Sequence, residues 1–335
     1  MRGTITAATL LAALLGGAAS VVSCEAPDRA RAEAATLHRF VGTAMGCEIE
    51  ITVDEPDAAK AREAARAAQL ELDRIEEVLT DWRASSEVGK FNASQALRVA
   101  ASADLRDVTR RALEVARASD GLFDPTVAPL VRLWRTARRA GGLAPEPALA
   151  EARACVGYRR LRVEGDALVR DDACVRLDFG GIGKGYGALK ALEVLRANGC
   201  PRALVAVAGD IAAGDPPRGR VAWSVEIVPE SASGQREVVE VSKAAVSTSG
   251  GSEQFVEIEG TRYAHIVDPR TGLGATALAQ VTVVGPLDCS VDALGTALAL
   301  APDADAARRI LAAFPATRAR IERAGAARWI DAGAR

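Results

Sequence analysis

The chain has little of what zinc enzymes and nucleic-acid-binding proteins need. Its 335 residues include two histidines and six cysteines, with no Cys-x-x-Cys pair, so the ligand spacing of a zinc site is missing. The charges nearly balance, because 42 basic residues stand against 44 acidic ones. A net charge of −2 argues against the basic surface that binds nucleic acid, and we expect no nucleic-acid partner.

The amino terminus carries an apolar run over about residues 5–22, closed by small residues before Cys24. This order is typical of a secretory signal, and a cysteine at its exit favours a lipoprotein. We therefore expect residues 1–23 to be a signal peptide and 24–38 a tether, with lipidated Cys24 anchoring the protein to a membrane. The protein would be exported and would face the periplasm or the cell exterior. A plain cleaved signal and an uncleaved anchor helix are the alternatives.

Five cysteines remain after Cys24, and this odd number leaves at least one thiol unpaired. An exported protein can form disulfides. Cys155 and Cys174 stand at opposite ends of a predicted hairpin that turns at residues 164–166. They are the pair that we expect to be bonded.

The remaining chain, residues 39–335, predicts an α+β fold with mainly antiparallel sheets and flanking helices. Residues 40–53 alternate as a strand does, and Asp57 caps a predicted helix that ends near Leu79. The Gly/Pro/Ala-rich residues 139–147 predict a surface loop. Hairpin patterns outnumber strand–helix–strand units, which favours antiparallel sheet. The length suits one domain or a domain of two subdomains.

Residues 177–187 form the densest motif, with five glycines among residues 180–187. Glycines let a backbone approach a ligand closely, and free amides at a helix start bind anions, to which Lys184 adds a positive charge. A P-loop is excluded, because it needs glycine in place of Asp178 and serine or threonine in place of Gly185. Residues 183–188 fit a Rossmann fingerprint loosely. A glycine-rich turn with a surface lysine is the remaining alternative.

Two further segments carry residues suited to chemistry. His265 precedes a predicted turn, where it is placed to act as a general base, although a lone histidine also serves as a cap or a core residue. Asp292 and Thr296 are four residues apart on a predicted helix and so share one face. A carboxylate and a hydroxyl suit Mg²⁺, but an acid is also favoured in the first turn of any helix, beside an outward threonine.

Seven segments follow one another in a fixed order: residues 42–46, 82–92, 121–127, 177–187, 248–250, 265–272 and 292–296. This order and spacing resemble the ApbE family of FAD:protein FMN transferases over about residues 39–300. Two positions depart from the family pattern. Cys47 stands where threonine is usual, and Ala208 stands in a position where paired glycines are typical. For the second reason the neighbouring Asp210 is left out of the predicted site.

The resemblance implies an enzyme that takes FAD as its substrate and joins the FMN half, through a phosphoester bond, to a threonine or serine of an acceptor flavoprotein. AMP leaves. Mg²⁺ would be held by Asp292, Thr296 and the backbone carbonyl of Gly181, and His265 is our choice of base. The FAD contacts that the family pattern implies are Met45, Trp82, Leu122, Phe123, Asp124, Asp178, Lys184 and Val267.

Two other functions remain open at this point. One is a lipoprotein that binds FAD, or splits its pyrophosphate, without a protein acceptor. The other is a Rossmann oxidoreductase that uses residues 183–188 to bind a dinucleotide and needs no Mg²⁺.

Overall fold

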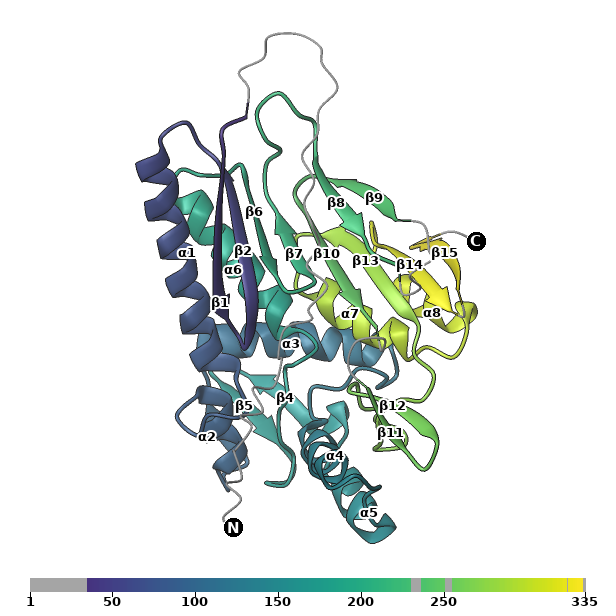
Figure 1. Cartoon of the computed structure of the whole chain (residues 1–335). Coiled ribbons are helices and arrows are strands. Elements are labelled where there is room, and N and C mark those ends of the chain that lie inside the picture. Colours follow the sequence, from purple (N-terminus) through teal and green to yellow (C-terminus); the bar gives the residue numbers. More distant parts are fainter. Residues whose placement is uncertain (1–34, 230–235, 251–254, 324, 334–335) are drawn as a thin grey trace, which may run out of the picture.

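The computed structural model describes residues 35–229, 236–250, 255–323 and 325–333. Its largest element is an eight-stranded sheet (Figure 1), in which every neighbouring pair of strands is antiparallel. In order across the sheet, the strands are β1 (Leu37–Ala44), β2 (Cys47–Asp54), β6 (Ala203–Val207), β7 (Asp210–Ala213), β10 (Ala244–Ser249), β13 (Gln280–Pro286), β14 (Arg318–Arg323) and β15 (Ala326–Asp331).

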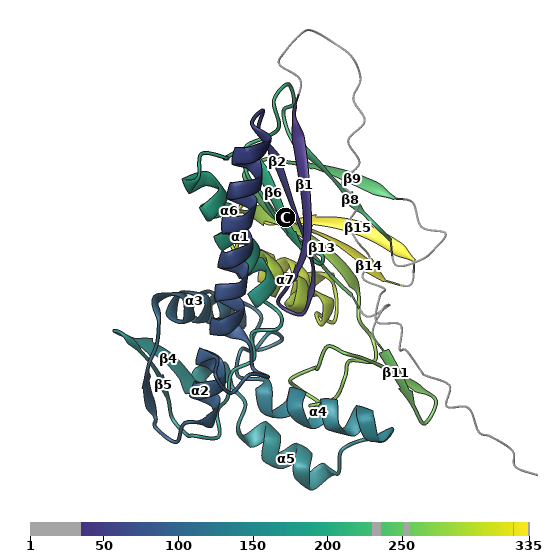
Figure 2. The same ribbon diagram turned by 60° about the vertical axis from the view of Figure 1, so that its left-hand side comes forward.

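Helices cover one face of this sheet, and Figure 2 shows α1, α6 and α7 stacked along it. Among the described residues, no helix has both the length and the apolar character that a membrane crossing needs. The helices are α1 (Ala58–Leu79), α2 (Glu87–Ala93), α3 (Ala103–Ala118), α4 (Ala128–Ala140), α5 (Glu146–Ala154), α6 (Gly183–Ala197), α7 (Ser290–Ala299) and α8 (Ala304–Leu311), with a short 3₁₀ turn at Tyr158–Arg160.

The opposite face of the sheet is covered in part by the hairpin of β8 (Trp223–Ile227) and β9 (Glu237–Val241). Strand β6 has apolar side chains on both of its faces, as expected for a strand that is covered on both sides. Its Val205 packs among the residues of α1 and α6, whereas Leu204 packs against Trp223 of β8. The smaller strands are β3 (Arg98–Ala100), β4 (Leu161–Glu164), β5 (Ala167–Arg170), β8 (Trp223–Ile227), β9 (Glu237–Val241), β11 (Phe255–Ile258) and β12 (Thr261–Ala264).

The α+β class and the antiparallel sheet are confirmed, but the single strand predicted over residues 40–53 is wrong. The chain turns at Met45 and Gly46, and β1 pairs with β2 as a hairpin. Both turn residues have positive φ, 55° and 74°. A two-residue hairpin turn of type I′ requires this conformation at both positions. Glycine adopts positive φ freely but methionine does not. The turn was therefore not predicted, because Met45 is not a typical turn residue.

The loop predicted over residues 139–147 is also wrong at both ends. Helix α4 continues to Ala140 and ends where Gly141 adopts the left-handed conformation, with φ 73°. Helix α5 begins at Glu146 and takes Pro147 in its first turn, where the missing N–H of proline has no intrahelical partner to lose. Only residues 141–145 connect the two helices.

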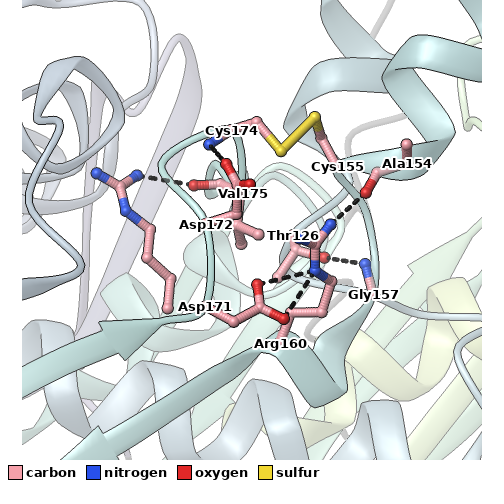
Figure 3. The surroundings of a disulfide bond; sticks show 10 residues. Thr126, Ala154, Cys155, Gly157, Arg160, Asp171, Asp172, Cys174 and Val175 are labelled. Carbon is pink, nitrogen blue, oxygen red and sulfur yellow. Dashed lines mark hydrogen bonds and ion pairs between the residues drawn. A yellow bond between two sulfur atoms is a disulfide. The ribbon is translucent and has the colours of Figure 1, made fainter.

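The expected disulfide is present. Cys155, directly after α5, is bonded to Cys174 in the loop after β5 (Figure 3). In the sequence, the hairpin β4–β5 lies between the two cysteines. The nearby Arg160 side chain also pairs with Asp171, 2.9 Å away, across the same hairpin. Cys47, Cys200 and Cys289 are free thiols.

Removing this disulfide should lower the free energy of unfolding by about 3 kcal/mol, because the bond closes a loop of 19 residues in the unfolded chain. Denaturant titration of the wild type, with and without reductant, measures the effect. The Cys155→Ser/Cys174→Ser double variant should match the reduced wild type and should not respond to reductant. Equal stability of the oxidised wild type and the double variant would contradict the prediction.

Candidate active site

The glycine-rich segment forms a loop over residues 177–182 that leads directly into α6. Helix α7 packs closely against this loop and the start of α6. A Cβ atom on Gly185 would lie 2.8 Å from Asp292 Cβ, and one on Gly181 would lie 2.9 Å from Thr296 Oγ1. Only glycine fits at such distances. The three predicted metal ligands therefore come together, two from α7 and one from the loop.

Lys184 lies between two buried carboxylates. Its Nζ atom is 2.6 Å from Asp210 Oδ2 and 3.9 Å from Asp292 Oδ1. Both acids are only 3% exposed. The backbone N–H of Gly185 donates to Asp292 Oδ2 at 2.9 Å. Lys184 is thus an ion-paired residue of a buried cluster, not a solvated lysine on a glycine-rich turn.

This cluster has an excess of negative charge when its three side chains ionise. Burial, and then the charge of Asp210, raises the pKa of Asp292 to about 7, although Lys184 opposes the shift. Burial disfavours the ammonium of Lys184, but the two carboxylates outweigh it and raise the pKa of Lys184 above its usual value. Asp210 Oδ1 is buried and accepts no hydrogen bond from the described residues. An unmatched negative charge beside an unused acceptor favours the binding of a cation.

The residues present fit Mg²⁺. Asp292 and Thr296 lie one turn apart on α7, and the Thr296 hydroxyl faces Gly181 instead of pointing outward. With the Gly181 carbonyl they would supply a carboxylate, a hydroxyl and a peptide oxygen. All three are hard oxygen donors of the kind that Mg²⁺ takes, and Mg²⁺ completes its shell with phosphate oxygens and water.

Phe123 lies against the glycine-rich loop, and Met45 lies against the first turns of α6 that follow it. A Cβ atom on Gly187 would lie 2.6 Å from Met45 Sδ, and one on Gly181 would lie 3.3 Å from Phe123 Cε2. The backbone N–H of Met45 donates to Glu76 Oε2 at 2.5 Å, which fixes the β1–β2 turn against α1. Two predicted FAD contacts thus supply apolar surface beside the predicted metal ligands. Leu122 is also buried, in the same core cluster as Phe123.

The two other predicted acids, Asp124 and Asp178, differ in the hydrogen bonds that their carboxylate oxygens accept. Both oxygens of Asp124 accept hydrogen bonds within the protein: one from the N–H and the hydroxyl of Thr126 at 2.8 and 2.6 Å, and the other from the N–H of Tyr158, in the 3₁₀ turn, at 2.8 Å. Asp178 accepts from the N–H of Gly180 at 2.7 Å through Oδ1, whereas its buried Oδ2 has no hydrogen-bond partner in the described structure. Asp178 therefore has an oxygen available to a ligand, and Asp124 holds the loop that carries Phe123.

The remaining predicted residues, Trp82, His265 and Val267, lie on other segments of the chain. Trp82 is 59% exposed in the connection between α1 and α2. His265 is exposed directly after β12, whose last residue, Ala264, accepts a 3.3 Å hydrogen bond from Trp134 Nε1. Val267 is buried beside Trp134. The structure brings one group of predicted residues onto the glycine loop: Met45, Phe123, Gly181, Lys184, Asp292 and Thr296.

The family model of ApbE proteins matches residues 45–320 of this chain. The chain belongs to the ApbE family. Its relatives include the FAD:protein FMN transferase of Escherichia coli (strain K12), which is 28% identical over 304 residues and 85% of each chain. The FAD:protein FMN transferase of Treponema pallidum (strain Nichols) is 31% identical over 296 residues, which cover 83% of this chain and 81% of that one.

Solved ApbE structures share the fold over most of its length. The flavin transferase ApbE of Vibrio cholerae has a TM-score of 0.76 and 25% identity, and covers 89% of this chain and 98% of its own. The ApbE protein of Thermotoga maritima has a TM-score of 0.77 at 25% identity, with 89% and 97% covered. The ApbE resemblance seen in the ordered motifs is thereby confirmed.

The Rossmann alternative is wrong. A dinucleotide fingerprint lies between two parallel strands of a βαβ unit. Here α6 begins with residues 183–188, but it is preceded by a loop and followed by β6, which is antiparallel to both β2 and β7. The glycines of this ApbE chain serve the close packing of α7 and Met45 instead.

Asp210 belongs to the site but was not predicted from the sequence. It begins β7, immediately after a turn in which Ala208 has a positive φ of 51°. The chain therefore forms this turn with Ala208 in place of the glycine that is usual in ApbE proteins. Asp210 was left out of the predicted site because that glycine is absent. One signal pointed to Asp210: it is an acid beside a turn between two strands that are otherwise apolar.

Proposed function

We propose that this chain is a Mg²⁺-dependent FAD:protein FMN transferase, which moves FMN from FAD to a threonine or serine hydroxyl of an acceptor flavoprotein. Its relatives in the ApbE family carry the name of that activity. The observation that carries the proposal is the convergence of Lys184, Asp292 and the Gly181–Thr296 contact at the start of α6. Phosphoryl transfer depends mainly on positioning and on charge stabilisation, and this cluster supplies both.

FAD would bind with its pyrophosphate at this helix start. The ammonium of Lys184 lies where it can pair with a phosphate oxygen, and the positive end of the α6 helix dipole favours an anion. Mg²⁺, held by Asp292, Thr296 and the carbonyl of Gly181, would neutralise further charge on the pyrophosphate. Apolar, aromatic and carboxylate groups would hold the rest of the dinucleotide: Met45, Trp82, Leu122, Phe123, Asp178 and Val267. Asp124 would contribute by holding the loop that carries Phe123.

The transfer itself exchanges one bond to phosphorus for another. The acceptor hydroxyl oxygen forms a bond to the phosphorus of the FMN half, and the bond from that phosphorus to the bridging oxygen breaks. AMP leaves with the bridging oxygen. His265 takes the hydroxyl proton, a role that suits an imidazole near neutral pH. Its exposed position after β12 leaves it accessible to a protein substrate.

A gel assay tests this function. The purified chain is incubated with FAD, Mg²⁺ and candidate acceptor flavoproteins from the same source, and the products are separated under denaturing conditions. We expect a fluorescent acceptor band that requires both FAD and Mg²⁺. An acceptor band that forms equally well in the presence of a chelator would remove Mg²⁺ from the proposal. Free flavin without any labelled protein would favour the FAD pyrophosphatase alternative.

The predicted signal peptide and Cys24, the predicted site of lipid attachment, lie outside the described residues. We propose that the mature enzyme is a lipoprotein anchored to a membrane on the periplasmic or outer side. Cys24→Ser should move the protein from the membrane fraction to the soluble fraction, because one acyl-bearing residue carries the anchor. Immunoblotting of the two fractions measures this. A Cys24→Ser protein that stays with the membranes would support the uncleaved anchor helix.

A further inference from the structure

Arg135 on α4 connects two acids from different parts of the chain. Its Nη1 atom is 3.1 Å from Asp81 Oδ2, and its Nη2 atom is 3.6 Å from Asp178 Oδ2. Asp81 directly precedes the exposed Trp82, and Asp178 belongs to the glycine loop. The ApbE resemblance assigns no role to Arg135, although it assigns FAD contacts to Asp178 and to Trp82, the residue that follows Asp81.

The geometry of Arg135 leaves Asp178 able to bind a ligand. At 3.6 Å, the guanidinium compensates the charge of Asp178 without forming a hydrogen bond to Oδ2, which stays buried and unsatisfied. Burial and the nearby charge of Asp81 both raise the pKa of Asp178, whereas the N–H of Gly180 and the charge of Arg135 lower it. Without Arg135, the two carboxylates would face each other with no cation between them, and like charges at short range repel.

The backbone that carries Arg135 is fixed by its neighbour Trp134. The indole N–H of Trp134 donates to the carbonyl of Ala264, and its ring packs 5.5 Å from that of Tyr263. The chain at Gly274 runs so close that a Cβ atom there would lie 2.6 Å from the indole. A buried, hydrogen-bonded tryptophan holds this turn of α4 in place. The guanidinium of the next residue therefore extends from a rigid support.

We propose that Arg135 is a positioning residue for FAD, which holds the Asp81–Trp82 segment at a fixed separation from Asp178. The exposed Trp82 ring offers a flat surface for stacking, and Asp178 Oδ2 offers an acceptor. Both groups can serve one bound dinucleotide only if their separation is set in advance. This inference rests on the proposed function, since it takes FAD as the ligand.

The test compares FAD affinity in Arg135→Gln, Arg135→Lys and Arg139→Gln, with no acceptor present. Arg139 is exposed one turn later on the same helix, so its substitution removes the same charge from the same surface. Titration of flavin fluorescence should show the Kd for FAD raised about tenfold in Arg135→Gln and partly restored in Arg135→Lys. Arg139→Gln should bind FAD as the wild type does. In transfer assays, KM for FAD should rise in Arg135→Gln while kcat changes little.

A double-mutant cycle separates positioning from a general loss of structure. Asp81→Asn should weaken FAD binding as well, and the Arg135→Gln/Asp81→Asn variant should be no weaker than Arg135→Gln alone, because the two residues act as a pair. Equal Kd values for Arg135→Gln and Arg139→Gln, in a wild type that transfers FMN, would overturn this inference alone. An Arg135-dependent Kd in a wild type that labels no acceptor would overturn the transfer proposal and leave the positioning role in place.

Discussion

Replacing Asp292 with alanine should lower the rate of flavin transfer by at least about a thousandfold, because the chain would lose the carboxylate of its Mg²⁺ site. Thr296 and the Gly181 carbonyl would remain, but neither carries a charge. Asp292 also anchors the first turn of α6 through the N–H of Gly185, so its loss disturbs the anion site as well. Rates of acceptor labelling at saturating FAD, measured across a range of Mg²⁺ concentrations, give the comparison.

The fold should tolerate the loss of this charge. Asp292 is buried beside Asp210, and burial and this neighbouring charge both disfavour its ionised form and raise its pKa. Asp292→Asn, which keeps an oxygen for the N–H of Gly185, should therefore melt no lower than the wild type without Mg²⁺. It should also lose the rise in melting temperature that Mg²⁺ causes in the wild type.

Asp288→Asn is a matched control, since Asp288 lies one turn earlier and asparagine also caps a helix start. This variant should keep both the transfer rate and the response to Mg²⁺. A wild-type transfer rate in Asp292→Ala would contradict the metal assignment. The same conclusion would follow if Asp288→Asn and Asp292→Asn lost the Mg²⁺ response equally.

Replacing His265 with alanine should slow transfer by about 100-fold to 10 000-fold, the range that a positioned general base contributes. FAD binding should be unchanged, because His265 is exposed after β12 while the predicted pyrophosphate site lies at the start of α6. Two measurements are needed: the Kd for FAD from flavin fluorescence, and the rate of acceptor labelling. Added imidazole should restore part of the rate, since the exposed position admits a small base.

The chain contains one other histidine, which provides the control. His38 lies on the edge strand β1, where its Nε2 pairs with the carbonyl of Glu55 at 2.9 Å. His38→Ala should transfer FMN at the wild-type rate. If His265→Ala also labels the acceptor at that rate, the base lies elsewhere. His265 would then have a structural role, which is the alternative stated in the sequence analysis.

The sequence predicted those parts of the fold that depend on local patterns. Asp57 caps α1 as expected, and its side chain accepts from the N–H groups of Ala59 and Lys60. The hairpin β4–β5 brought Cys155 and Cys174 together. These features depend on neighbours in the chain, and a periodic pattern or a turn signal suffices to find them.

Features that depend on distant segments were not predicted. Asp210 reaches Lys184 only because the β6–β7 turn lies beside the start of α6. Arg135 reaches Asp178 only because α4 packs near the glycine loop. The turn at Met45 was missed for another reason: methionine seldom adopts positive φ, and the Glu76 side chain that holds the turn comes from the next helix.

The central claim is that FMN becomes covalently attached to another protein, and the intact mass of the acceptor tests it most directly. After incubation with this chain, FAD and Mg²⁺, we predict that the acceptor gains the mass of FMN less one water, with one AMP released for each acceptor labelled. Replacing the labelled threonine or serine of the acceptor with alanine should abolish the gain. An acceptor of unchanged mass, in a reaction that converts FAD to free FMN and AMP, would contradict the account.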